Sequence, residues 1–208
     1  AMYLAAAGIG TLTICDGDSV DLTNLQRQIV HRETAVGEKK VDSARATLLG
    51  LNPGIRIQAV AERVSGDRLQ ALVEAADVVL DGCDNFETRH AVNRACVRAG
   101  KPLVSGAGIR FDGQLAVFDL RRADSPCYAC LFPEDGEMEE MRCAVMGVFA
   151  PLVGIIGAMQ AAEALKLAAG AGEVLSGRLL LLDALTMDLR TVSLKRDPAC
   201  PVCAARAA

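Results

Sequence analysis

The chain has 208 residues, a formal net charge of −4, 51% hydrophobic residues and only 3% aromatic ones. This length predicts one α/β domain, and a mean hydropathy of +0.27 indicates a large core built from Ala, Leu, Val and Ile. The negative charge and the lack of a basic run argue against nucleic-acid binding.

The opening residues have the pattern of the second half of a nucleotide-binding βαβ unit. A small-residue helix stops at a glycine, and a β-branched run at 11–15 then ends at Asp16. In such units about 20 residues separate a glycine-rich turn from the acid. The first strand and the glycine-rich turn are therefore expected to precede Ala1.

Residues 41–107 alternate between predicted helices and strands. Helical spacing of apolar residues predicts the helices, and apolar or alternating runs predict the strands. The predicted helices are 41–53, 65–76 and 86–100, and the predicted strands are 55–64, 77–85 and 102–107. This alternation favours a parallel sheet with right-handed crossovers.

The pattern changes in the second half of the chain. An Asp-Gly pair in FDGQLAVFDLR (111–121) predicts a turn and an alternating strand, which favours antiparallel pairing. A polar loop (121–143), an apolar helix and two strands (178–184 and 191–195) follow. The expected fold class is α/β: a Rossmann-like open sheet, parallel in its first half and with antiparallel strands in its second half.

The apolar stretch 144–162 is long enough to span a membrane and has Gln160 as its only polar side chain. However, Pro151 divides it, glycines interrupt it, and no Lys/Arg cluster flanks its start. We therefore expect a buried core or subunit-interface helix and no membrane span. The N-terminal residues also lack the cationic flank of a signal peptide, so we expect a cytoplasmic protein.

Four of the eight cysteines form two C-x-x-C pairs, Cys127/Cys130 and Cys200/Cys203. Because the pairs are far apart in the sequence, they can meet only in the folded chain. Four thiolates suit a tetrahedral, structural zinc site, which would join the C-terminal tail to the loop after segment 111–121. The alternative is two redox-active or unrelated pairs.

Polar residues occur where predicted strands end, at the edge where open α/β sheets bind ligands. The carboxylate of Asp16 can bind a ribose hydroxyl there. Asn24, Arg27 and Lys40 follow closely and together suit a triphosphate, whose charge must be neutralised during transfer. Each of these three, taken alone, is better explained as part of a solvated, charged helix start.

Two further places in the chain could carry chemistry. Asp84-Asn85 closes a buried strand, where a carboxylate could hold Mg²⁺ or a side chain could cap the next helix, and these two roles are compatible. Cys143 stands between an acidic loop and the apolar helix. It is either a thiol with a lowered pKa at a helix N-terminus or a small buried hydrophobic residue.

Seven motifs, in this order, resemble the MoeB/ThiF/HesA family of bacterial relatives of ubiquitin-activating enzymes. They are CDGDSVDLTNLQRQ, the GEKK turn, DGCDN, SGAGIRFDGQ, CYAC, the run from Cys143 to Pro151, and CPVC. Members of this family adenylate the C-terminal glycine of a small ubiquitin-like sulfur carrier and release pyrophosphate. The resemblance implies a single adenylating domain over residues 1–208, lacking its first strand and glycine-rich loop.

The resemblance also implies cofactors and residue roles. ATP and Mg²⁺ would be bound by Asp16, Thr23, Asn24, Arg27, Lys40, Asp84 and Asn85. Of these, Asp16 would bind the ribose, Asn24, Arg27 and Lys40 would reach the phosphates, and Asp84 would be the Mg²⁺-binding catalytic acid. Lys40 is preferred to Lys39 because it keeps the family's three-residue step from Gly37. The four paired cysteines would bind Zn²⁺, Cys143 matches a cysteine that some members use as an acyl or sulfur carrier, and loop 134–140 would close over the carrier's tail.

The implied partner is a sulfur carrier with a Gly-Gly C-terminus, of the molybdopterin-synthase or the thiamin type, with the motifs leaning towards the former. A homodimer and a separate sulfurtransferase are also expected. An NAD-dependent oxidoreductase shares the acid-ended strand, but it leaves Asn24, Arg27, Lys40 and the paired cysteines unexplained. The other alternative is a truncated, catalytically impaired homodimer that binds the carrier.

Overall fold

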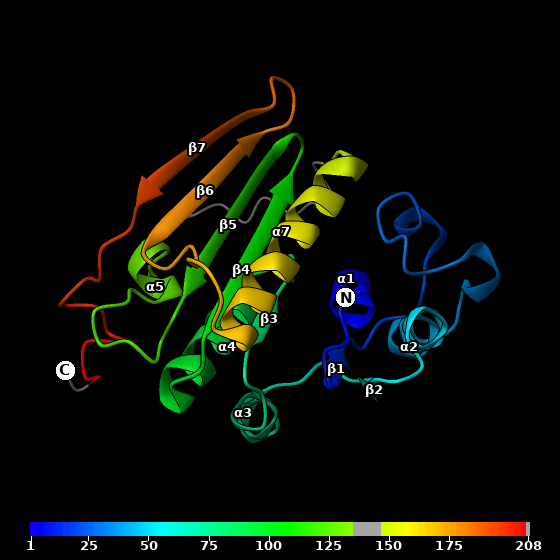
Figure 1. The fold of residues 1–208 in the computed structure, drawn as a ribbon, viewed down its shortest axis with the longest axis horizontal. Coiled ribbons are helices and arrows are strands. Elements are labelled where there is room, and N and C mark those ends of the chain that lie inside the picture. The colour runs from blue at the N-terminus through cyan, green and yellow to red at the C-terminus, as the bar shows by residue number, and fades with distance from the viewer. Residues whose placement is uncertain (135–146, 207–208) are drawn as a thin grey trace. The chain divides into compact units, whose positions relative to one another are not determined.

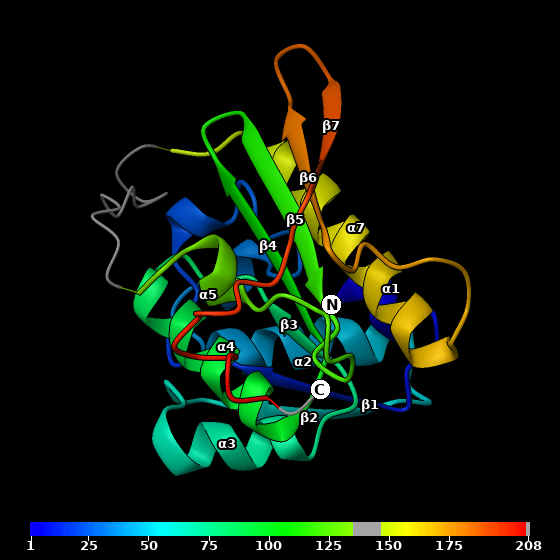
Figure 2. The ribbon, with the colours of Figure 1, turned by 90° about the vertical axis from the view of Figure 1, so that its left-hand side faces the viewer.

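The computed structural model describes residues 1–134 and 147–206. The chain forms two compact units, Ala1–Val64 and Ser65–Ala208. Figures 1 and 2 label their elements.

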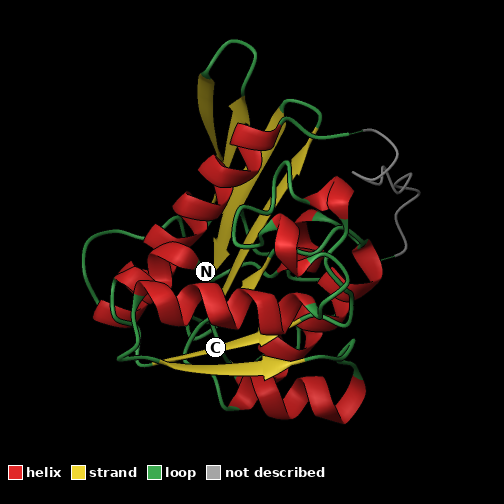
Figure 3. Ribbon diagram, turned by 90° about the vertical axis from the view of Figure 1, so that its right-hand side faces the viewer, coloured by secondary structure: helices red, strands yellow, loops and turns green. Residues whose placement is uncertain are grey.

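The first unit is built around a parallel pair of strands. Its elements are α1 (Met2–Ala6), β1 (Thr11–Cys15), the 3₁₀ segments η1 (Leu22–Asn24) and η2 (Glu33–Ala35), α2 (Lys40–Leu51) and β2 (Arg56–Val60). Thr11 lies opposite Arg56 and Cys15 opposite Val60, and Figure 3 shows the two strands side by side. Helix α2 ends at Leu51, before the Asn52-Pro53 step that predicted its end.

The core of the first unit joins both helices to the strand pair. Ala5, Leu48, Ile55 and Ile57 are all buried and form one apolar cluster. The side-chain amide of Asn52 donates a hydrogen bond of 2.9 Å to the carbonyl of Ala5, which ties the end of α2 to α1. Leu12 and Ile14 of β1 also pack against this cluster, so the strand that leads to Asp16 is part of the same core.

The second unit contains a five-stranded sheet in the order β3-β4-β5-β6-β7. Strands β3 and β4 are parallel, and the remaining pairs are antiparallel. This mixture of parallel and antiparallel pairing confirms the α/β class predicted from the sequence. The elements are α3 (Gly66–Glu74), β3 (Val79–Asp81), α4 (Phe86–Ala99), β4 (Leu103–Ile109), β5 (Asp112–Phe118), α5 (Tyr128–Leu131), α7 (Ala150–Ala169), β6 (Arg178–Asp183) and β7 (Asp188–Ser193).

The turn between β4 and β5 lies earlier than predicted. Ile109 pairs with Asp112, so the turn consists of Arg110 and Phe111, and Arg110 has a positive φ of 50°. The predicted Asp112-Gly113 turn is therefore wrong, and Gly113 lies within β5. A Cβ on Gly113 would come within 2.8 Å of Leu152 on α7, so this glycine permits close packing of the helix on the sheet.

Helix α7 begins later than the apolar stretch 144–162 suggested. It starts at Ala150 with Pro151 in its first turn, where a missing N–H costs nothing, and Gly170 ends it in the left-handed conformation. Its Leu152 and Ile156 pack against Leu182 of β6, and Figure 1 shows it along β4 and β5. Among the described residues, α7 is the one helix whose length and composition would allow a membrane crossing, and 39% of its apolar window is buried.

Candidate active site

Asp16 and Lys40 lie together at the carboxyl end of β1. The Nζ of Lys40 is 3.7 Å from Asp16 Oδ2 and 3.5 Å from Asp18 Oδ2, and the lysine side chain is only 12% exposed. The backbone N–H of Lys40 donates to the carbonyl of Asp18 at 3.1 Å, which fixes the start of α2 beside the strand end. A largely buried ammonium is thus held next to an acid that can accept a ribose hydroxyl.

The two adjacent lysines have different contacts. Lys39 donates from Nζ to the carbonyl of Gly17 at 2.9 Å, so its ammonium stabilises the loop itself. Among the described residues, the Lys40 ammonium pairs with the side-chain carboxylates of Asp16 and Asp18 instead of a backbone carbonyl. Arg63 pairs with Asp18 at 3.0 Å, and this hydrogen bond, with the Lys40 charge, holds the pKa of Asp18 below its usual range.

Thr23, Asn24 and Arg27 lie on one short helical segment after Asp21. The carboxylate of Asp21 caps η1 by accepting from the backbone N–H of Thr23 at 2.8 Å and from its hydroxyl at 2.5 Å. The N–H of Arg27 donates to the carbonyl of Asn24 at 3.1 Å, and its Nη1 donates to the carbonyl of Thr23 at 3.2 Å. The predicted set of Asp16, Asn24, Arg27 and Lys40 therefore belongs to one unit.

Asp84 and Asn85 form the turn between β3 and α4 in the second unit. Asn85 is the N-cap of α4, and its Oδ1 accepts from the N–H of Thr88 at 2.8 Å. Asp84, one residue earlier, is exposed to solvent. The capping function therefore falls to Asn85, which leaves the carboxylate of Asp84 accessible to a ligand.

A buried ion pair between Asp81 and Arg89, which no sequence pattern indicated, lies beneath this turn. The Nη1 of Arg89 is 3.1 Å from Asp81 Oδ2, and the two side chains are 8% and 3% exposed. The same guanidinium donates to the carbonyls of Cys83 and Gly106, the latter at 3.2 Å. Arg89 thus joins the end of β3, the turn that carries Asp84, and strand β4.

Gln160 of α7 holds the same strand end from another side. Its Nε2 donates to the carbonyl of Asp81 at 2.8 Å and to that of Val104 at 3.2 Å. Gly106 leaves room for this side chain, since a Cβ there would be 2.5 Å from Gln160 Cδ. The sequence signal for this contact was that Gln160 is the only polar side chain in the apolar stretch 144–162.

The four paired cysteines meet in the fold. Their sulfur atoms all lie within 4.8 Å of one another, with Cys127 at the N-cap of α5 and Cys200 and Cys203 on the tail that passes α5 in Figure 2. Three of the sulfur–sulfur distances are 3.7, 3.9 and 3.5 Å. The prediction that both pairs form one cluster is confirmed.

The protonation of this cluster is uneven. Hydrogen bonds from the Cys127 thiol and from the backbone N–H groups of Cys127 and Asp197 lower the pKa of Cys130 to about 4. The hydrogen bond that Cys127 shares with Cys130, together with burial, raises the pKa of Cys127. The thiolate of Cys130 is therefore the one that its neighbours stabilise.

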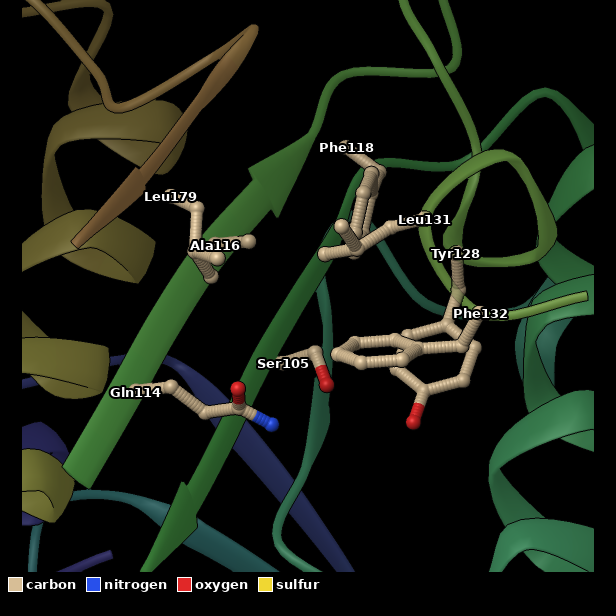
Figure 4. A pocket seen from close by; sticks show the side chains of 8 residues that line it. All are labelled: Ser105, Gln114, Ala116, Phe118, Tyr128, Leu131, Phe132 and Leu179. Atoms are coloured by element: carbon tan, nitrogen blue, oxygen red, sulfur yellow. The ribbon is translucent and has the colours of Figure 1, made fainter. Parts of the chain in front are cut away.

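A small pocket lies beside the Asp81–Arg89 pair in the second unit. Its cavity volume is about 10 Å³, which is room for about one water molecule, and its lining includes Ser105, Gln114, Phe118, Tyr128 and Phe132, as Figure 4 shows. Binding sites for small molecules have volumes of roughly 300–1,000 Å³, so this pocket is too small for a nucleotide. Burial raises the pKa of Tyr128 to about 12, so its hydroxyl stays protonated at neutral pH.

Two sequence predictions fall largely outside the described residues. Cys143 lies within the part of the chain that the structure does not describe, and so does nearly all of loop 134–140. The exception is Glu134, whose carboxylate is 2.7 Å from Arg94 Nη1 and 3.8 Å from His90 Nδ1. The start of the loop is therefore fastened to α4.

Comparisons with known proteins agree with this architecture. Residues 1–202 match the model of the ThiF family. The molybdopterin-synthase adenylyltransferase of Escherichia coli (strain K12) is 46% identical over 201 residues, which make up 97% of this chain and 80% of that protein. The SAMP-activating enzyme E1 of Haloferax volcanii is 45% identical over 202 residues, covering 97% of this chain and 74% of that protein.

Solved structures share the fold at lower sequence identity. The crystal structure of E. coli MccB matches with a TM-score of 0.82 and 23% identity, over 100% of this chain and 61% of that chain. The structure of E. coli MccB with ATP gives 0.82 and 24%, over 98% of this chain and 62% of the other. From its match to the family model and to these relatives, the chain belongs to the ThiF family.

Proposed function

We propose that this protein adenylates the C-terminal glycine of a ubiquitin-like sulfur-carrier protein with ATP. The 46% identity to a molybdopterin-synthase adenylyltransferase, over 80% of that enzyme, is the observation that carries the proposal. The position of Lys40 between Asp16 and Asp18, where β1 ends, supports it. The product would be a mixed anhydride that a sulfur nucleophile can attack.

The residues of the first unit are suited to bind and orient the nucleotide. Asp16 would accept the ribose hydroxyls, and Asn24, Arg27 and Lys40 would bind the phosphates, with Lys40 exchanging its carboxylate partners for phosphate oxygens. Neutralising the charge that develops on pyrophosphate lowers the barrier of such a transfer, and no covalent enzyme intermediate is needed. We assign to Asp84 the binding of Mg²⁺, which would neutralise phosphate charge.

The four-cysteine cluster fits zinc. A regular tetrahedron of sulfur atoms about 2.3 Å from Zn²⁺ has edges of about 3.8 Å. The distances of 3.7, 3.9 and 3.5 Å between the cysteine sulfurs match these edges. We propose a structural site, because four thiolates would complete the coordination and leave no position for a substrate.

The remaining parts of the proposal concern assembly and pathway. A Rossmann-like arrangement of the strands, a homodimer and a cytoplasmic location are consistent with the proposed activity. The carrier would be of the molybdopterin or the thiamin type, with sulfur delivered by another protein. The MOCS3 protein of Bos taurus, 45% identical over 208 residues, is named an adenylyltransferase and sulfurtransferase, and this chain spans 45% of its length.

The test is ATP–pyrophosphate exchange with the full-length protein and carriers of both types. We expect exchange to require the carrier's terminal Gly-Gly. Asp84→Ala should lower the exchange rate by about 100-fold or more, because it removes a charge that acts in the transition state. Asp77→Ala is the matched control, because Asp77 is an exposed acid just before the amino end of β3, whereas Asp84 follows its carboxyl end.

Two results would contradict parts of the proposal. Equal rates for Asp84→Ala and Asp77→Ala would remove the role of Asp84. Carrier binding without any exchange in the wild-type protein would favour the alternative of a catalytically impaired carrier-binding protein.

A further inference from the structure

Asn93 uses both ends of its carboxamide inside the second unit. It lies on α4 with 0% of its surface exposed. Its Oδ1 accepts from the backbone N–H of Tyr128 at 2.9 Å, and its Nδ2 lies 3.6 Å from the sulfur of Cys127, to which it donates. A buried amide with no partners would be costly, so these two contacts explain how the core tolerates it.

Both partners of Asn93 belong to the first cysteine pair. Cys127 is the N-cap of α5, and Tyr128 is the first residue of that helix. The first N–H groups of a helix lack acceptors within the helix, and the Oδ1 of Asn93 is the acceptor for one of them, the N–H of Tyr128. Its Nδ2 then has one sulfur within reach, and that sulfur belongs to the four-cysteine cluster.

We propose that Asn93 is an outer-shell residue of the metal site, which orients Cys127 and holds its thiolate through an amide N–H···S hydrogen bond. This inference rests on the zinc site proposed above and is independent of the adenylation activity. Outer-shell partners fix the orientation of metal ligands, and their loss commonly costs about 10–100-fold in metal affinity. The N–H dipole also compensates part of the charge that four thiolates place around one dication.

Helix α4 carries Asn93 and also Arg89, so it contacts both the cysteine cluster and the turn that contains Asp84. Arg89 lies one helical turn before Asn93 and holds the carbonyl of Cys83 in the turn that carries Asp84. Asn93 therefore joins the cysteine cluster to the same helix that begins at this turn. The metal site and the turn share one rigid support.

The first experiment measures the rate at which the zinc-loaded, full-length protein releases Zn²⁺ to a chromophoric chelator. Asn93→Leu removes both hydrogen bonds and keeps the number and branching of the heavy side-chain atoms. Asn93→Asp keeps an acceptor for the Tyr128 N–H but turns a carboxylate towards the Cys127 sulfur. Cys96→Ala is the matched control, since Cys96 is equally buried on α4 and lies outside the cluster.

We expect both Asn93 variants to release Zn²⁺ about 10–100-fold faster than wild type, and Cys96→Ala to stay within about twofold of it. Asn93→Asp should be the faster of the two because of charge repulsion. Release at the wild-type rate by folded Asn93 variants would overturn the inference while leaving the zinc site intact. Wild-type protein that binds no zinc would overturn both.

A second experiment needs no variant, so it decides the matter even if the substitutions prevent folding. The wild-type protein is loaded with ¹¹³Cd²⁺ and labelled with ¹⁵N at asparagine. An N–H···S–Cd contact transmits scalar coupling, so we expect the Asn93 side-chain amide proton to couple to the metal. Absence of coupling, with amide shifts that are the same with and without metal, would contradict the proposal.

Discussion

Arg89 illustrates how one buried side chain can fix several parts of the backbone. Its guanidinium pairs with Asp81 and also binds the carbonyls of Cys83 and Gly106. A planar fork of donors can satisfy these directions together, whereas the ammonium of a lysine cannot reproduce them. The turn that carries Asp84 therefore depends on a residue that touches no ligand.

We predict that Arg89→Gln lowers the free energy of unfolding by about 3–5 kcal/mol, because it leaves the carboxylate of Asp81 buried without a counter-charge. Arg98→Gln on the same helix is the control, since Arg98 makes an exposed hydrogen bond to Gln70 and should contribute about 1 kcal/mol or less. Urea unfolding of both variants provides the measurement. Equal decreases in the free energy of unfolding for the two variants would show that the buried pair contributes no more to stability than an exposed hydrogen bond.

At the scale of elements, the packing of α7 on the sheet depends on glycines in the strands. Gly106 leaves space for Gln160, and Gly113 lies against Leu152 and Ile156. Gly108 also faces the helix, but a Cβ there would be 3.4 Å from its nearest neighbour, which is close to ordinary contact. The strand glycines are therefore not equivalent.

We predict that Gly113→Ala lowers the free energy of unfolding by about 1–3 kcal/mol, because the added methyl group overpacks the contact with α7. Gly108→Ala should change it by less than about 1 kcal/mol, as the neighbouring side chains have to move little. Thermal and urea unfolding can compare the two. A larger loss for Gly108→Ala would contradict this account of the helix–sheet contact.

The element boundaries show what local sequence can and cannot predict. Pro53 and Gly100 indicated two helix ends because their backbone preferences act locally. Gly113 was assigned to a turn because its actual reason, the close approach of α7, is a tertiary contact that no local pattern reveals.

The same division applies to the candidate site. The two C-x-x-C pairs allowed their proximity in the fold to be predicted, because four such thiols are typical of a single metal site and of few other functions. Asp81 on β3 and Arg89 and Asn93 on α4 gave no such signal, since polar residues are usually exposed and only the packing shows that these three are buried.

At the scale of the whole molecule, all described contacts of the cysteine cluster lie within the second unit. Arg196 on the tail donates to the carbonyls of Ala123 and Cys203, and Arg206 donates to the carbonyls of Arg122 and Ser125. The tail is thus fastened to loop 122–125 around the cluster. Metal binding should therefore stabilise one unit selectively.

We predict that removing the metal with a strong chelator speeds backbone hydrogen exchange in segments 122–131 and 196–206. A metal that binds only the folded state stabilises that state, and its removal withdraws this contribution. Segment 1–64 should exchange at an unchanged rate. Exchange measured by mass spectrometry checks both statements, and uniform acceleration along the chain would contradict them.

The distance along the chain between the cysteine pairs has a consequence for how the protein is made. Cys127 and Cys200, like Cys130 and Cys203, are 73 residues apart, so a metal bound by the proposed site would close a long loop. By the polymer relation used for disulfides, a cross-link of this span removes about 4 kcal/mol of chain entropy from the unfolded state. On the ribosome this loop cannot close until Cys203 has left the exit tunnel. The nascent second unit must therefore remain competent to fold through the synthesis of β6 and β7, and a metal cross-link between the two pairs can form only afterwards.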